Sequence, residues 1–213
     1  MIDFPKTTAV HRRLPKEAFY RNLPLTPKLK EKFVSDVDRI YVENSLTKEG
    51  LNLSSDGTIT EILLLSVSLK KREFDGKVAE AIARQNPHKL VFLLIYEDER
   101  QLALYHGKLY RTPWMPEAEL SLEARGFTLD EIWSGLIEQI ALYGEQRGAP
   151  AELTVDERLA RQEKIQKLEK QIQKLEKQIA KTEAAAWKEQ QPKKRFALYQ
   201  KLQEYKKELD TLS

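Results

Sequence analysis

The sequence predicts an α+β fold. A mixed β-sheet of about four to five strands, with a crossover helix and flanking helices, precedes a C-terminal antiparallel helical hairpin. Two observations carry this prediction. Apolar runs of strand length surround one amphipathic helix in the order strand, strand, helix, strand, strand. Near its end, the chain repeats KLEKQI with a period of seven, which is the spacing of a coiled coil. A Gly-Ala-Pro linker sets the expected boundary between an α+β domain at residues 1–148 and a helical hairpin at residues 149–213.

The first third of the α+β domain is expected to supply a helix and two strands. Three prolines make the first 25 residues irregular, apart from one short helix after Pro15. A Thr-Pro pair provides the N-cap and first position of a helix over Pro27–Val37. Alternating apolar residues predict a strand at 39–44, and the apolar run at 58–69 predicts a central strand.

The middle of the chain is expected to complete the sheet. Asp75 caps a helix that ends before Asn86-Pro87. Strands at 90–96 and 101–106 form a hairpin across an acidic turn, and residues 108–112 continue it as a short strand. The helix is therefore the right-handed crossover between two strands, and it covers one face of the sheet.

One more helix is expected before the linker. Residues 113–127 form a polar connector, after which Thr128 caps a helix that runs to Tyr143. A wide apolar stripe predicts that this helix packs on the sheet.

The heptad repeat predicts a helix that is held against a partner helix. Five residues share the two core positions of the seam: Ile165, Leu168, Ile172, Leu175 and Ile179. Two heptads are marginal for an independent coiled coil, and a second apolar stripe lies at 193–209 after a short turn. Pairing within the chain is favoured because the short turn keeps the entropy of loop closure low. A hairpin closed in this way can still leave a face for a homodimer.

Composition limits the classes of function. The chain has no cysteine, which excludes disulfides, thiolate metal sites and a cysteine nucleophile. The N-terminal residues do not resemble a signal peptide, and no apolar run is long enough to span a bilayer, so we expect a cytoplasmic protein without membrane contact. We find no P-loop, dinucleotide fingerprint, HExxH or Gly-x-Ser-x-Gly, and we expect no cofactor. Three separated histidines (His11, His88 and His106) are expected to make structural hydrogen bonds.

One catalytic alternative follows from a short motif. Metal-dependent nucleases place an Asp on one strand and an acidic-x-Lys triplet on the next, so that carboxylates hold Mg²⁺. Asp75-Gly-Lys77 has the triplet form, and Asp56 or Glu61 would supply the first carboxylate. Capping of the following helix is the competing interpretation of Asp75.

Positive charge is concentrated at both ends of the chain and after the central strand. Residues 1–30 carry seven Lys or Arg against two acidic residues. Two basic runs are candidates for phosphate contact: Lys70, Lys71 and Arg72, and Lys193, Lys194 and Arg195. Solvated surface is the competing interpretation of both runs.

The order of segments resembles a known family. LPKEAFYRNLPLTPKLKEKFVSDVDRIYVENSLT, TITEILLLSVSLKK and AEAIARQNPHKLVFLLIYEDERQLALYHGKLY precede a charged helical tail. This pattern is similar to the uncharacterised bacterial family called domain of unknown function 4391. The resemblance implies no catalytic residues. It implies an accessory role, because relatives are often encoded beside helicases and DNA methyltransferases of restriction-like or phage-defence loci.

The sequence therefore favours a non-catalytic accessory protein that binds a helicase or methyltransferase. Two alternatives stay open: a divergent Mg²⁺-dependent nuclease, and a sequence-independent nucleic-acid binder that uses Lys193, Lys194 and Arg195.

Overall fold

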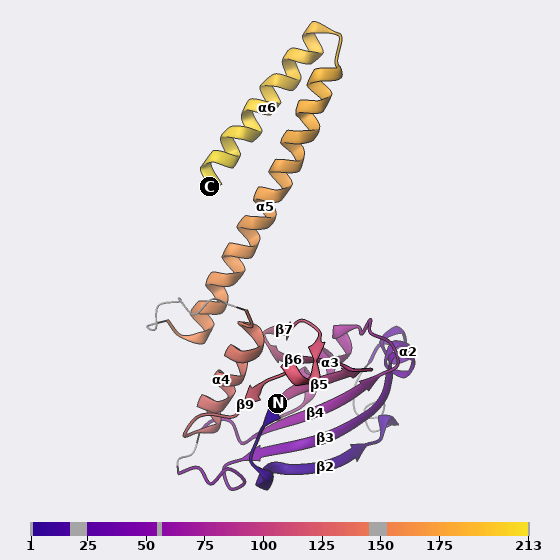
Figure 1. Ribbon diagram of the computed structural model, residues 1–213, viewed down its shortest axis with the longest axis vertical. Helices are drawn as coiled ribbons and strands as arrows, with labels where there is room; N and C mark the ends of the chain where they lie inside the picture. The colour runs from indigo at the N-terminus through magenta and orange to yellow at the C-terminus, as the bar shows by residue number, and fades with distance from the viewer. Residues whose placement is uncertain (1, 18–24, 55–56, 145–152, 213) are drawn as a thin grey trace. The chain divides into compact units, whose positions relative to one another are not determined.

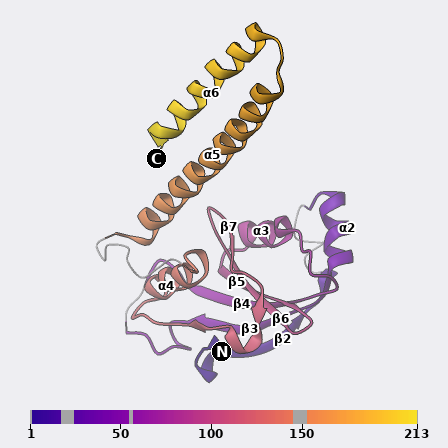
Figure 2. The same cartoon turned by 45° about the horizontal axis from the view of Figure 1, so that its top comes forward.

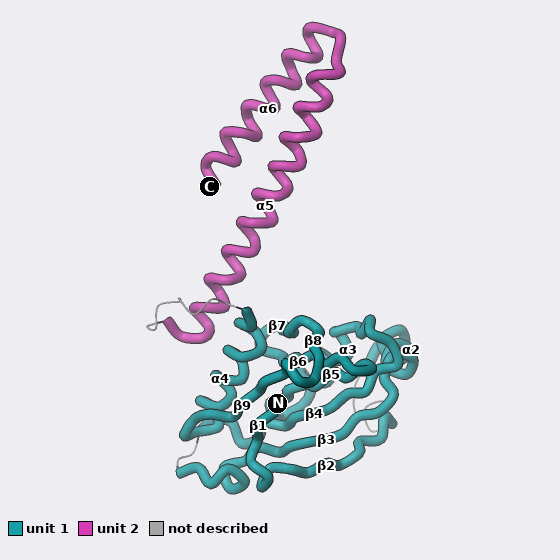
Figure 3. Tube along the Cα trace, viewed as in Figure 1, with its two compact units in different colours: residues 1–147 teal, residues 148–213 magenta. Residues whose placement is uncertain are grey.

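The structure is a computed structural model that describes residues 2–17, 25–54, 57–144 and 153–212. The chain divides into two compact units, residues 1–147 and residues 148–213 (Figure 3). The first unit combines a sheet with short helices, and the second contains two long helices that form a hairpin. The predicted α+β class with its C-terminal hairpin is therefore confirmed.

The main sheet of the first unit has seven strands within the described residues, more than the sequence indicated (Figure 1). Its order is β2-β3-β4-β5-β6-β7, and β8 also pairs with β6. The strands are β2 Ala9–Leu14, β3 Val37–Thr47, β4 Glu61–Leu69, β5 Lys89–Tyr96, β6 Glu99–His106, β7 Lys108–Arg111 and β8 Met115–Pro116. β4 and β5 run parallel, and the other pairs are antiparallel, so the sheet is mixed as expected.

The extra strands lie in segments that were expected to be irregular. β2 is an edge strand whose side chains are nearly all exposed, so it shows no apolar alternation. His11 sits at a β-bulge in this strand, with a positive φ of 43°. A separate two-stranded sheet joins β1 (Ile2–Asp3) to β9 (Leu122–Glu123) from the polar connector. Two short 3₁₀ helices, η1 Lys6–Thr8 and η2 Glu117–Glu119, complete these segments.

Side-chain caps fix where the helices of the first unit begin. The helices are α2 Pro27–Asp36, α3 Gly76–Gln85 and α4 Leu129–Ala141. The hydroxyls of Thr26 and Thr128 and the carboxylate of Asp75 each accept a hydrogen bond from a backbone N–H in the following turn. α3 joins the parallel pair β4 and β5, and it is the crossover helix that the sequence predicted. The short helix expected after Pro15 lies largely outside the described residues.

The two faces of the sheet bury different helices (Figure 2). On one face, Leu65 and Val67 pack with residues of α2 and α3 in a single apolar core. Alternation along β4 turns Leu64 to the other face, where α4 packs against β4, β6 and β7. This packing of α4 was predicted from its apolar stripe.

The second unit is a hairpin of α5 (Val155–Lys188) and α6 (Pro192–Leu212). Thr154 and Glu157 form a reciprocal capping box at the start of α5. Leu175, Ala186 and Leu202 are buried where the two helices meet. No helix among the described residues is long and apolar enough to cross a membrane.

Candidate functional site

The basic run after the central strand is tied into the first unit by its own contacts. Lys71 forms an ion pair of 2.7 Å with the buried carboxylate of Asp36. Arg72 donates two hydrogen bonds to Glu99, at 2.6 and 3.0 Å, and these hydrogen bonds lower the pKa of Glu99. Lys70 donates to a backbone carbonyl oxygen, 3.2 Å away. These three charges are therefore engaged within the fold, and their contact with phosphate stays a prediction.

The residues of the nuclease alternative do not converge. Glu61 begins β4, whereas Asp75 follows the opposite end of this strand. The two ends of the nine-residue strand are about 25 Å apart. Asp75 accepts a hydrogen bond from the backbone N–H of Lys77, as a helix cap does, and forms an ion pair of 2.6 Å with Lys32. The hydrogen bond from Lys32 lowers the pKa of Asp75. Asp56 lies outside the described residues.

Glu61 has structural partners of its own. It accepts a hydrogen bond from Ser45, and His88 Nδ1 lies 3.2 Å from its carboxylate. Within the part of the chain that the structure describes, no group of three or more acidic, histidine or cysteine side chains is arranged to hold a metal ion. The nuclease hypothesis stays a prediction that this geometry does not support.

A polar cluster that the sequence did not reveal lies on the sheet. Glu43 accepts a hydrogen bond from the buried Ser66, and His11 Nδ1 lies 2.8 Å from its other oxygen. The His11 ring stacks on Tyr41, with ring centroids 5.1 Å apart. The Ser66 hydroxyl bonds to the carboxylate rather than to the imidazole, so the cluster does not have the order of a nucleophilic triad. It joins the edge strand β2 to the centre of the sheet.

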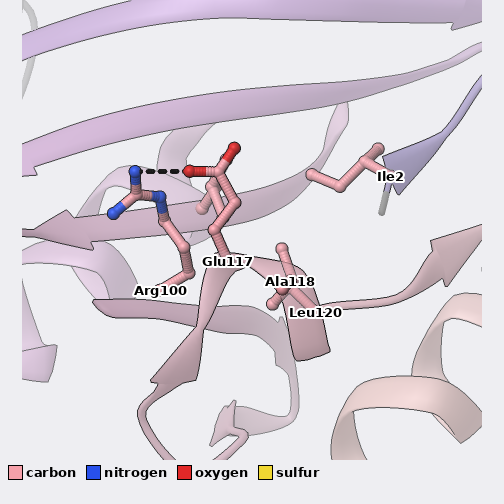
Figure 4. Close-up of a pocket in the computed structure, with 6 residues that line it drawn as sticks. Ile2, Arg100, Glu117, Ala118 and Leu120 are labelled. Atoms are coloured by element: carbon pink, nitrogen blue, oxygen red, sulfur yellow. Dashed lines mark hydrogen bonds and ion pairs between the residues drawn. The ribbon is translucent and has the colours of Figure 1, made fainter. Parts of the chain in front are cut away.

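A cavity of about 580 Å³ opens beside β5 and β6 (Figure 4). Ile2, Leu93 and Leu120 supply much of its apolar lining. Its charged groups, Arg100 and Glu117, form an ion pair of 2.7 Å. The two charges neutralise each other, so neither is left to bind a charged ligand.

The heptad seam is covered over only part of its length. α5 has 34 residues and α6 has 21, so α6 can face α5 only from the turn back to about Leu168. Leu175 is 6% exposed within the hairpin, whereas Ile165 and Leu168 are 46% and 41% exposed. Ile172 and Ile179 are half-buried. Two of the five predicted seam residues therefore lack a full partner.

The turn of the hairpin is basic and aromatic. Lys193, Lys194 and Arg195 are exposed in the first turn of α6, which contains no acidic residue. Trp187 and Phe196 nearby are 78% and 65% exposed. The sequence analysis did not single out these aromatics. Neither of them continues the apolar stripe of its helix, and that pattern predicts an exposed ring.

Fold and surface together define a class: an α+β domain joined to a coiled-coil hairpin that has exposed seam residues and a basic, aromatic turn. Residues 2–209 match the model of the family described as Domain of unknown function (DUF4391), and the chain belongs to that family. Neither the curated proteins nor the solved structures contain a significant match to this chain.

Proposed function

We propose that this protein is a non-catalytic accessory protein that binds another protein through its helical hairpin. The observation that carries the proposal is the exposed part of the heptad seam, Ile165 and Leu168. Leu168 lies where α6 ends and Ile165 lies beyond it, so the two side chains continue the apolar interface between α5 and α6, and apolar seams of this kind are built to pack against a helix.

Charge indicates what kind of helix fits there. Arg161, Lys164 and Lys167 are exposed around the two seam residues, against two acidic residues, Glu163 and Glu169, in the same two turns. The proposed occupant is therefore an amphipathic helix with apolar anchors and acidic flanks. Electrostatic complementarity of this sort sets partner choice and association rate.

The chemistry of the first unit is consistent with an accessory role. Asp75 caps α3 and pairs with Lys32, and Glu61 contacts Ser45 and His88. These carboxylates have structural roles that account for their positions. The family resemblance supplies the class of partner that we propose, a helicase or DNA methyltransferase of a restriction-like or phage-defence system.

The test is a pulldown from native lysate with identification of the captured proteins, followed by reconstitution with the purified partner. Burying the exposed halves of Ile165 and Leu168 should contribute about 1.5–3 kcal/mol to binding. The double variant Ile165→Gln, Leu168→Gln should therefore weaken binding of the partner by about 10- to 150-fold.

The control variant is Gln166→Ala, Gln173→Ala, which changes exposed residues of α5 outside the seam and should bind normally. Equal binding by both variants would contradict the proposal. Light scattering of the purified chain should give a monomer. A dimer that the seam variant dissociates would instead assign the exposed seam to a second copy of this chain.

A further inference from the structure

The face of α5 that is distinct from its seam carries a row of lysines. Six lysines stand three, four or seven residues apart, which places them on one face of the helix: Lys167, Lys170, Lys174, Lys177, Lys181 and Lys188. All six are exposed, and in the described part of the chain none of them forms an ion pair. We call these six residues the lysine stripe. It extends over 22 residues of sequence, a length of about 30 Å.

The fold does not explain the lysine stripe. Lysines at positions i and i+4, such as Lys170 with Lys174 and Lys177 with Lys181, repel each other and destabilise a helix. Glu163 stands four residues before Lys167, but the acidic residues of the repeat, Glu169 and Glu176, occupy another side of α5, where no lysine lies three or four residues away to pair with them. Positive charge is therefore concentrated on this face at the expense of helix stability, as expected for a surface that binds a polyanion.

The turn of the hairpin extends the same chemistry. Lys188, the last residue of the lysine stripe, ends α5, and Lys193–Arg195 follow in the first turn of α6, which begins at Pro192 after a turn of three residues. These cations also form no ion pair among the described residues. Lys70–Arg72 differ in this respect, because all three charges have partners within the first unit. The sequence alone did not distinguish the two basic runs.

Exposed aromatic rings lie among the cations of the turn. Trp187, Phe196 and Tyr199 are 78%, 65% and 42% exposed, and Phe196 and Tyr199 share one side of α6 because they are three residues apart. Exposed rings beside unpaired cations are the combination that binds single-stranded nucleic acid, because the cations contact phosphates and the rings stack on unpaired bases. A lipid surface fits less well, since the apolar stripe of α6 is already packed against α5.

We propose that the helical hairpin binds single-stranded nucleic acid, with phosphates on the lysine stripe and on Lys193–Arg195, and bases on Trp187, Phe196 and Tyr199. This inference goes beyond the proposed partner role and uses residues other than the exposed seam. Binding is independent of base sequence, because neither phosphate contacts nor stacking distinguish bases strongly.

The test is fluorescence anisotropy of the full chain with a labelled 20-nucleotide oligo(dT), the matching RNA, a 20-base-pair duplex, and vesicles of phosphatidylglycerol. Oligo(dT) or the RNA should bind more tightly than the duplex, and the dissociation constant should rise steeply with salt. The variant Lys170→Ala, Lys174→Ala, Lys177→Ala should reduce the slope of log K against log salt by about 2. Trp187→Ala should weaken single-strand binding by about 5- to 150-fold and change duplex binding little.

The matched control is Lys201→Ala, Lys206→Ala, Lys207→Ala, which removes the same charge from exposed positions of α6 outside the lysine stripe. Circular dichroism verifies that each variant retains its helices. Four results would each overturn the proposal: no binding of the unaltered chain at low salt, equal affinity for duplex and single strand, preference for vesicles, or equal loss in the control and stripe variants.

Discussion

Removing lysines from the lysine stripe should make α5 more stable, which is unusual for a surface substitution. The variant Lys170→Ala, Lys174→Ala, Lys177→Ala eliminates four repulsive contacts at i,i+3 and i,i+4 spacing, including those with Lys167 and Lys181. At about 0.2–0.5 kcal/mol each, these contacts sum to about 1–2 kcal/mol at low salt. The higher helix propensity of Ala adds a smaller gain that does not depend on salt.

Hydrogen exchange of the α5 amides measures this stability locally, without unfolding the first unit. Protection of α5 in the variant should exceed that of the unaltered chain in 20 mM salt, and the excess should shrink in 500 mM salt, where charges are screened. The control Lys201→Ala, Lys206→Ala, Lys207→Ala removes lysines that stand three or four residues from Glu204 or Asp210. These pairs are attractive, so their loss should lower helix stability at low salt instead of raising it. A gain in α5 that is equal at both salt concentrations would refute the charge argument.

Other consequences concern the packing and capping of each unit. Asp75→Ala should cost about 0.5–2 kcal/mol through loss of the α3 cap, and Asp75→Asn, which keeps a capping oxygen, should cost less by urea unfolding. Because Lys32 lowers the pKa of Asp75 from 3.8, the stability from this carboxylate should be complete above that pH and lost as pH falls through the lower folded pKa. The same hydrogen bond raises the pKa of Lys32 from 10.5. The stability that Lys32 contributes should therefore be present below pH 10.5 and lost as pH rises through the higher folded pKa. Urea unfolding measured across this pH range checks both expectations. Leu202→Ala should destabilise the hairpin by about 2–4 kcal/mol, measured as lost amide protection in α5 and α6 together.

Much of the fold was readable because its signals are local. In the sequence, Asp75 and Asn86 marked the two ends of α3, and in the structure they are its N-cap and C-cap. Thr128 marked α4 in the same way. Seven-residue periodicity identified the hairpin, since a heptad pattern has few other structural solutions. The edge strand β2 was missed because its side chains face solvent and a bulge at His11 interrupts its alternation.

The candidate surfaces depended on distances that a sequence does not contain. Lys71 and Lys193 look alike in the chain, but only the fold brings Asp36 to Lys71 and leaves Lys193 without an acidic partner among the described residues. The exposure of Ile165 follows from where α6 ends relative to α5, which no single helix reveals. The lysine stripe was readable in principle from its spacing, but the stronger heptad pattern on the same helix obscured it.

The most direct test of the central claim, that the hairpin is an interaction device, is the identified pulldown with the exposed seam intact and altered. We expect the unaltered chain to capture a helicase or DNA methyltransferase from native lysate and to bind it again when purified. The Ile165→Gln, Leu168→Gln variant should lose that protein, and the Gln166→Ala, Gln173→Ala control should retain it. A folded seam variant that captures and rebinds the same partner as the unaltered chain would contradict the account.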